Sequence, residues 1–189
     1  MKEKRLSNVA GFDDAPFDRG HQGGVPIVGT VYAGLRFDGV LVGEIEKDGS
    51  DAAQKLGDLI AGSRFAEHVR LVMLQGIAFG GFNVVDAFAL HRRLGVPVLA
   101  VSRKPPDMAA IKNALINRVD NGAEKWQIIE QLGTMEPVGN VYVQRVGITL
   151  EQAAAAVKRF SIHGNIPEPL RTAHLIATAL ECGQSRGHP

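Results

Sequence analysis

The stretch VRLVMLQGIAFGGFNVVDAFALHRRLGVPVLAV, residues 69–101, decides the fold class of this chain. It begins with an apolar run of strand length at residues 69–74 and ends with a second such run at residues 98–101. Between them, residues 84–94 have the apolar spacing of a helix that Gly95 closes. Strands that alternate with a helix in this way lie side by side in a parallel arrangement. The stretch therefore predicts two parallel strands in one sheet.

The residues before this stretch predict three more strands. A mostly apolar run at residues 8–14 ends in two acids, and the β-branched runs 25–33 and 40–45 flank a turn signal at Asp38-Gly39. The two later runs therefore predict a hairpin. A helix is expected to open at Asp51, with a buried stripe of Ala52, Leu56, Leu59 and Ile60.

The rest of the chain predicts mainly helices. Helices are expected at residues 108–119, 123–132, 150–160 and 169–180, a strand at 141–146, and loops at Pro105-Pro106 and 133–139. Together the elements predict an α/β fold, a mixed sheet with early antiparallel and later parallel strands and with helices on both faces. A doubly wound nucleotide fold fits less well, because a hairpin stands where a crossover helix should be and no glycine-rich phosphate fingerprint follows the first strand.

Composition sets limits on the class of protein. A chain of 189 residues, 45% hydrophobic and 22% charged, suits one globular domain over residues 1–189. No run approaches the ~20 apolar residues that span a bilayer, and the single Cys182 fits a reducing compartment, so a cytoplasmic location is expected. Because the formal net charge is only +1, any surface for nucleic acid must be local.

The acids at the end of the first strand are the first candidates for chemistry. Successive side chains of a strand face opposite ways, so only one of Asp13 and Asp14 points to a given site, and Asp13 is favoured. The alternative is that both acids solvate the strand end and start a turn.

Two further acids lie where the hairpin passes into the first helix. Asp48 and Asp51 can approach the end of the first strand there, and clustered carboxylates suit Mg²⁺. The alternative for Asp51 is a helix N-cap, and the two functions could be divided between Asp51 and Asp48.

Polar, glycine and basic residues follow the two parallel strands. Gln75 ends one strand as a neutral amide that can orient water or phosphate. Gly80 and Gly81 belong to a loop before a helix, which predicts either a phosphate contact or a tight turn. Arg103 and Lys104 come directly after the other strand and predict contacts to a nucleic-acid backbone.

The last helix carries two stripes at helical spacing. The apolar stripe is Leu170, Ala173, Ala177 and Leu180, and the polar stripe is Arg171, His174, Thr178 and Glu181. The polar stripe can line a pocket together with Asp14 or Asp86, although a lone histidine is more often a structural residue. No motif for a covalent nucleophile is present in the sequence, which disfavours covalent catalysis.

Four segments resemble one known family along nearly the whole chain. They are GFDDAPF at 11–17, KDGSDA at 47–52, QGIAFGGFNVVD at 75–86 and PEPLRTAHLIA at 167–177. These segments are similar to the archaeal endonuclease V-like family, long described as a domain of unknown function. The resemblance implies a ribonuclease H-like fold and a nuclease that uses Mg²⁺ or Mn²⁺ to cut nucleic acid, DNA above all, near deaminated bases such as uracil or hypoxanthine.

The resemblance also implies roles for individual residues. Asp13 corresponds to the metal acid of the first strand, Asp51 or Asp48 to the second acid, and Arg103 or Lys104 to a basic residue near the scissile bond. One departure is that this chain has Gln75-Gly76 where the family usually has Asp-Gly. Three alternatives follow: a single ion suffices, Asp14 or Asp86 substitutes, or the protein binds nucleic acid without cleaving it. The resemblance does not determine the oligomeric state.

Overall fold

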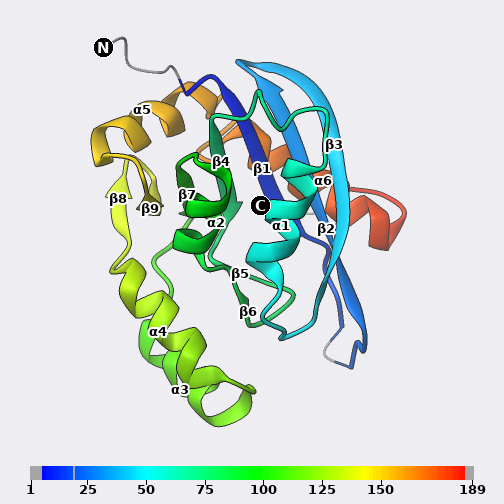
Figure 1. Cartoon of the computed structure of the whole chain (residues 1–189), viewed down its shortest axis with the longest axis vertical. Helices are drawn as coiled ribbons and strands as arrows, with labels where there is room; N and C mark the ends of the chain where they lie inside the picture. Colours follow the sequence, from blue (N-terminus) through cyan, green and yellow to red (C-terminus); the bar gives the residue numbers. More distant parts are fainter. Residues whose placement is uncertain (1–5, 19, 186–189) are drawn as a thin grey trace.

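The computed structural model describes residues 6–18 and 20–185 and is organised around a seven-stranded mixed sheet (Figure 1). In spatial order the strands are β3 (Arg36–Glu46), β2 (Gly24–Ala33), β1 (Asn8–Asp14), β4 (Leu71–Gln75), β7 (Val98–Ser102), β9 (Val141–Val146) and β8 (Glu136–Val138). The central strands β1, β4 and β7 are parallel, and every other pairing in the sheet is antiparallel. The predicted mixed sheet, including the β2–β3 hairpin, is confirmed.

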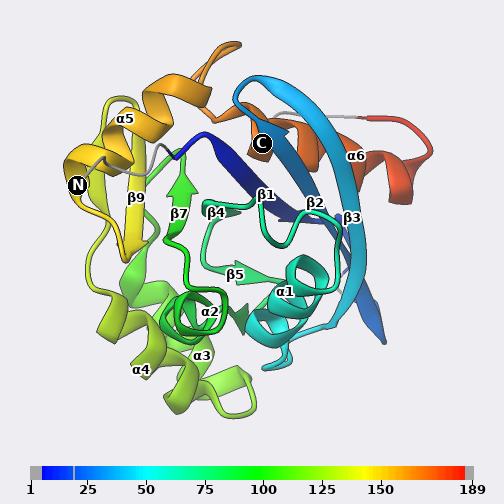
Figure 2. The same cartoon turned by 45° about the horizontal axis from the view of Figure 1, so that its top comes forward.

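Helices cover both faces of this sheet (Figure 2). Helices α1 (Ala52–Ala61) and α2 (Ala87–Leu94) lie on one face, and α5 (Leu150–Phe160) and α6 (Glu168–Cys182) lie on the other. Helices α3 (Met108–Arg118) and α4 (Gly122–Leu132) form a hairpin after β7, packed on the small ribbon of β5 (Ala78–Phe79) and β6 (Asn83–Val84). No helix among the described residues is both long enough and apolar enough to span a membrane.

The alternation of side chains along β1 explains how this strand packs against the helices on both faces of the sheet. Ala10 and Phe12 are fully buried against the α1 and α2 side, whereas Val9 is buried among residues of α5 and α6. Asp13 therefore belongs to the face covered by α6, and Asp14 belongs to the face covered by α1 and α2.

Helix α6 approaches β1 very closely at Gly11. A methyl group built on Gly11 would lie 2.6 Å from Cβ of Pro169 and 2.7 Å from its carbonyl carbon. Thr30 of β2 donates a hydrogen bond of 2.6 Å to the carbonyl oxygen of the same proline. These two contacts fix the first turn of α6 against the sheet.

Two predicted boundaries are wrong for identifiable reasons. The hairpin turns at Gly34, whose φ of +62° suits glycine, and the expected turn Asp38-Gly39 lies inside β3 beside a β-bulge. Helix α2 begins at Ala87 instead of residue 84, because Asn83 and Val84 pair with β5 and the Asp86 side chain caps the helix.

One further expectation, about the segment before β9, is wrong. Residues 136–138, expected in a loop, form β8 and pair with β9. Leu180, a member of the apolar stripe of α6, is 53% exposed near the end of the helix. The other three residues of that stripe are buried.

Candidate active site at the carboxyl ends of β1 and β4

Asp13 and Gln75 occupy neighbouring positions at the ends of two parallel strands. Phe12 pairs with Leu74, so the next residue of each strand, Asp13 and Gln75, stands in the same row, and parallel strands are about 4.8 Å apart. Both side chains belong to the face of the sheet that α6 covers. Gln75 in turn pairs with Val101 of β7. The site therefore lies at the carboxyl-terminal edge of the parallel strands.

The carboxylate of Asp13 is held by two hydrogen bonds. Its Oδ2 lies 2.8 Å from Nδ1 of His174 on α6, and its Oδ1 accepts a hydrogen bond of 3.0 Å from the backbone N–H of Asp14. The side chain of Asp13 is only 7% exposed, whereas that of His174 is 24% exposed. Burial raises the pKa of Asp13, and the hydrogen bond and charge of His174 oppose that rise.

Thr178 contacts the backbone of His174 and not its ring. Thr178, one turn further along α6, donates a hydrogen bond of 2.8 Å to the carbonyl oxygen of His174. When Asp13 is ionised, Nδ1 of His174 carries the proton that bonds the carboxylate. The second ring nitrogen, Nε2, is then the one that can accept or donate a proton.

Gln75 contributes an unsatisfied acceptor to this region. Within residues 6–18 and 20–185, its Oε1 is the buried side-chain oxygen or nitrogen that has no hydrogen-bond partner. An unsatisfied buried carbonyl costs about 1–3 kcal/mol. Such a group at the end of a strand, beside a carboxylate, is typical of a place where a ligand supplies the missing partner.

Asp14 faces the opposite side of the sheet and holds a loop there. Its Oδ2 accepts a hydrogen bond of 2.8 Å from the backbone N–H of Gly80. Burial, and then repulsion from Asp13, raise the pKa of Asp14 to about 6, although the Gly80 bond opposes the rise. The prediction that Asp13 and Asp14 serve different sides is confirmed.

Asp48 and Asp51 hold the same loop as Asp14. Oδ1 of Asp48 accepts a hydrogen bond of 2.8 Å from the backbone N–H of Phe82, and the backbone N–H of Asp48 donates to the carbonyl oxygen of Gly80. Asp51 stands at the N-cap position of α1 but does not cap it, because its carboxylate binds the amide of Asn83 at 2.6 Å. These two acids thus lie with Asp14, on the side away from His174.

No cluster of three or more histidine, cysteine, aspartate or glutamate side chains arranged to hold a metal ion is found in the described part of the chain. The predicted ligand set of Asp13 with Asp48 or Asp51 therefore stays a prediction. The phosphate contact predicted at Gly80 and Gly81 also stays one, and the Gly80 amide is already bonded to Asp14.

The other residues predicted for the site lie at three separate places in the structure. Arg103 and Lys104 are exposed just after β7, at the same edge as Asp13. Asp86 caps α2 by accepting a hydrogen bond of 2.9 Å from the N–H of Ala89. Arg171 makes two hydrogen bonds, of 2.8 and 2.7 Å, to the buried Glu168, so it neutralises that carboxylate and does not bond Asp13.

The sequence did not single out two buried polar residues that build the loop. Asn83 is fully buried and links Asp51, the carbonyl of Glu46 and the N–H of Ala52. Lys125 is 3% exposed and donates a hydrogen bond of 2.5 Å to the carbonyl oxygen of Asp48. No local pattern marks either residue, since these partners are distant in sequence.

The family of the chain follows from its sequence. A sequence model of the family described as endonuclease dU matches residues 5–181. The chain belongs to the endonuclease dU family. A UPF0215 protein from Deinococcus radiodurans is 51% identical over 183 residues, covering 97% of this chain and 93% of that protein. Another from Methanothermobacter thermautotrophicus is 42% identical, covering 95% and 90%.

Solved structures confirm the fold of this endonuclease dU family member. A protein of unknown function from Archaeoglobus fulgidus has a TM-score of 0.85 at 37% identity, covering 92% of this chain and 97% of that one. Endonuclease V from Ciona intestinalis, in complex with a 24mer DNA containing an inosine followed by a ribo-adenosine, has a TM-score of 0.57 at 15% identity, covering 89% and 83%. The resemblance to an endonuclease V-like family and the fold predicted from it are thereby confirmed.

Proposed function

We propose that this chain is a metal-dependent endonuclease that cuts nucleic acid, DNA above all, at deaminated bases such as uracil or hypoxanthine, and so serves DNA repair. The observation that carries the proposal is the hydrogen bond of 2.8 Å between Asp13 and His174 in the same row as the unsatisfied Gln75. A buried carboxylate, a histidine and an unpartnered carbonyl at one edge of a sheet form a polar site that a substrate can complete. Membership of the endonuclease dU family supports the same class of reaction.

The donor atoms present fit Mg²⁺ or Mn²⁺. Asp13 supplies carboxylate oxygens, and Gln75 supplies a carbonyl oxygen that lacks a partner, both hard ligands of the kind these ions prefer. Such an ion usually keeps several waters and takes only one or two protein carboxylates. When bound, it lowers the pKa of a water molecule and stabilises charge on phosphate oxygens.

The side chains of the site have separate tasks. Asp13 carries the negative charge that attracts the cation, and its raised pKa means that it must be ionised by a sufficiently high pH to do so. His174, oriented through Nδ1, can exchange a proton with water or with the leaving oxygen through Nε2. Gln75 orients rather than supplies charge, because an amide is neutral.

Two basic residues at the same edge of the sheet can bind the phosphate backbone of the substrate. Arg103 and Lys104 are exposed directly after β7, the strand next to β4. Arginine and lysine bind phosphate through charge-assisted hydrogen bonds, which position a nucleic acid without reading its bases. This placement supports nucleic acid as the partner.

A second candidate function is binding without turnover. Gln75 supports it, because the amide stands where a second acid would hold another ion. In that case the protein binds nucleic acid or a smaller ligand and Gln75 marks the loss of chemistry.

Cleavage of matched oligonucleotides tests the two functions. The natural protein, Asp13→Ala and Gln75→Asp are compared on strands with uracil, hypoxanthine, xanthine or no lesion, in Mg²⁺, Mn²⁺ or EDTA. We expect lesion-dependent nicking by the natural protein, and we expect EDTA and Asp13→Ala each to abolish it. Nicking by Gln75→Asp alone would establish the binding function for the natural chain, and equal nicking by Asp13→Ala would refute the assigned site.

A further inference from the structure

The edge of the sheet at β3 is apolar and has no partner strand. One backbone edge of β3 pairs with β2, and the other pairs with no strand in the described part of the chain. Half of the large hydrophobic side chains that are exposed in that part, four of eight, belong to this segment: Leu35, Phe37, Val40 and Val42. A long apolar edge of this kind readily adds another strand.

The middle of β3 lacks the features by which proteins usually protect a sheet edge. Residues 39–43 read GVLVG, without a charged residue or a proline. The two glycines have a local cause, since a methyl group on Gly39 would lie 2.6 Å from Phe65 and one on Gly43 would lie 2.8 Å from Leu59. The β-bulge of the hairpin lies before Gly39, so these five residues keep a regular register.

The same five residues read identically in both directions about Leu41, which is also the midpoint of β3. Antiparallel pairing of two copies about a two-fold axis at Leu41 therefore overlaps the full length of both strands. It places Val40 of each copy opposite the partner's Val42. Cross-strand pairs of β-branched residues are favourable in antiparallel sheets.

The backbone of β3 has the phase that this pairing needs. The N–H of Glu46 donates to Asp51 and its carbonyl oxygen accepts from Asn83, so Glu46 directs both groups away from β2. Backbone direction alternates along a strand, so Val42 and Val40 direct their N–H and carbonyl groups outward in the same way. These are the groups that bond a second copy on both sides of the axis.

The charges at the two ends of β3 also suit antiparallel pairing. Arg36 lies at one end, with Arg64 beside it, and Glu44 and Glu46 lie at the other. Asp38, the acid at the basic end, is already bonded to Arg36. Pairing about the axis brings the basic end of each copy to the acidic end of the other, which favours this orientation.

The length of β3 is sufficient for a stable interface. Its 11 residues extend about 37 Å in an antiparallel strand. A stable interface buries about 800 Å² on each partner, so a contact along the whole strand needs a width of about 22 Å. At this end of the sheet α1 lies on one face and α6 on the other (Figure 2). A strand edge flanked by two helices, each about 10 Å across, has that width.

We propose that this protein forms a two-fold dimer in which the β3 strands of two copies pair antiparallel about Leu41 and join their sheets. Val42 pairs with Val28, which packs against α6, so the valines of the two copies meet on the α6 face. Leu41 packs against the α1 side, so the two copies of this leucine meet on the other face.

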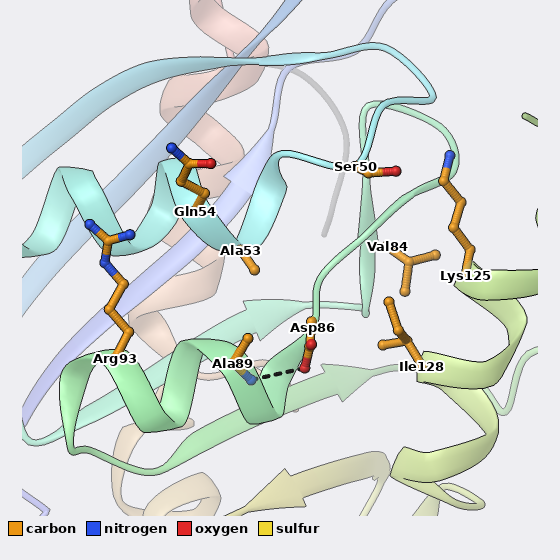
Figure 3. Close-up of a pocket in the computed structure, with 9 residues that line it drawn as sticks. All are labelled: Ser50, Ala53, Gln54, Val84, Asp86, Ala89, Arg93, Lys125 and Ile128. Carbon is orange, nitrogen blue, oxygen red and sulfur yellow. Dashed lines mark hydrogen bonds between the residues drawn. The ribbon is translucent and has the colours of Figure 1, made fainter. Parts of the chain in front are cut away.

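The dimer leaves the candidate active sites open. β3 runs in the same direction as β1, so the two-fold axis places the two Asp13 residues at opposite edges of the joined sheet. A pocket of about 560 Å³ between α1, α2 and α4 also stays open (Figure 3). Ala53 and Gln54 of α1 line that pocket, whereas Leu59 of α1 lies against β3. Dimerisation is therefore independent of the proposed nuclease function.

The mass of the full chain in solution tests the dimer. Light scattering and sedimentation at micromolar concentration should give twice the 20.3 kDa of one chain. Val42→Lys places a charge in the paired row and should raise the dissociation constant of the dimer at least tenfold. Ile116→Lys, at a similarly exposed position on α3, is the matched control and should dimerise like the natural protein. Because both side chains are exposed, circular dichroism should show that both variants are folded.

Cysteine cross-linking tests the register. In a Cys182→Ser background, which removes the exposed natural thiol, Leu41→Cys should form a disulfide between copies on oxidation. Its Cβ atoms would be about 4.5–5.5 Å apart across the axis. Val40→Cys should form little disulfide alone and much more when mixed with Val42→Cys. Ile116→Cys is the control and should not link.

The outcomes decide the inference without any nicking assay. A natural protein that is monomeric at micromolar concentration would overturn it. A dimer that Val42→Lys leaves intact, or that links through Ile116→Cys but not through Leu41→Cys, would place the interface elsewhere and overturn it as well. A dimer with the expected cross-links in a protein that nicks nothing would support the inference and leave only the nuclease rejected.

Discussion

Nδ1 of His174 lies 2.8 Å from Oδ2 of Asp13, although 161 positions separate the two residues in the chain. The bond joins the end of the central strand β1 to the middle of the last helix, α6. In this pair the imidazole ring of His174 is partly exposed and can exchange protons, whereas the carboxylate of Asp13 is buried.

Removal of this ring should change both the rate and the pH dependence of nicking. His174→Ala is expected to lower the rate by about 10²-fold or more, the usual contribution of a proton-transfer group. Because His174 opposes the raised pKa of Asp13, its loss should also move the acidic limb of the pH–rate profile to higher pH. Rates measured from pH 5 to 9 test this, with His163→Ala, a 71% exposed histidine bonded to Glu168, as control. An unshifted limb would show that His174 does not act on Asp13.

Asp14 should make folding stability fall between about pH 4 and pH 6. Its pKa is raised to about 6 in the folded chain from an ordinary value of 3.8, so the folded state binds the proton more tightly than the unfolded state. Stability from this group is complete below pH 4 and decreases as pH rises toward 6. Asp14→Asn should therefore be more stable than the natural protein at pH 7 and equal to it near pH 4. Urea unfolding in EDTA at both pH values tests this, and a larger gain at pH 4 would contradict it.

Asp48 allows a metal role to be separated from a structural one. Asp48→Ala removes the acceptor for the N–H of Phe82 and should lower the free energy of unfolding by about 1–3 kcal/mol. Asp48→Asn keeps an acceptor oxygen and suits the positive φ of 52°, so it should be nearly as stable as the natural protein. If Asp48→Asn is stable but loses nicking, the residue acts through its charge. If Asp48→Asn keeps nicking, the negative charge of Asp48 is not needed for cleavage and its side chain only holds the loop.

The contact between β1 and α6 should be sensitive to one methyl group. Gly11→Ala places Cβ 2.6 Å from Pro169 and within 3 Å of its backbone, so the helix must move. Overpacking of this kind costs about 1–3 kcal/mol, and the shift should weaken the Asp13–His174 bond and reduce nicking. Gly20→Ala is the control, because nothing lies within 4 Å of the added methyl group. Thermal unfolding and nicking rates measure both effects, and equal behaviour of the two variants would refute the close contact.

Local pattern determined most of the elements in this protein. The run at residues 8–14 is β1 to the residue, and the helices α3, α4, α5 and α6 were placed within two residues at each end, because apolar periodicity is a property of neighbouring residues. Strand alternation also assigned Asp13 and Asp14 to opposite faces. The sequence prediction was wrong where strand pairing determines the structure. The hairpin turns at Gly34 and not at Asp38-Gly39, and the segment of β8 forms a strand by pairing with β9.

The arrangement of the candidate site was decided only by tertiary structure. The sequence identified Asp13, His174, Asp48 and Asp51 as candidates. It did not show that His174 pairs with Asp13, or that Asp48 and Asp51 hold a loop on the opposite face. Nor did it indicate that Lys125 of α4 reaches the carbonyl of Asp48, 77 positions away. Hydrogen bonds between distant residues depend on how the sheet and helices pack, and that packing is a property of the whole chain, which a local pattern does not contain.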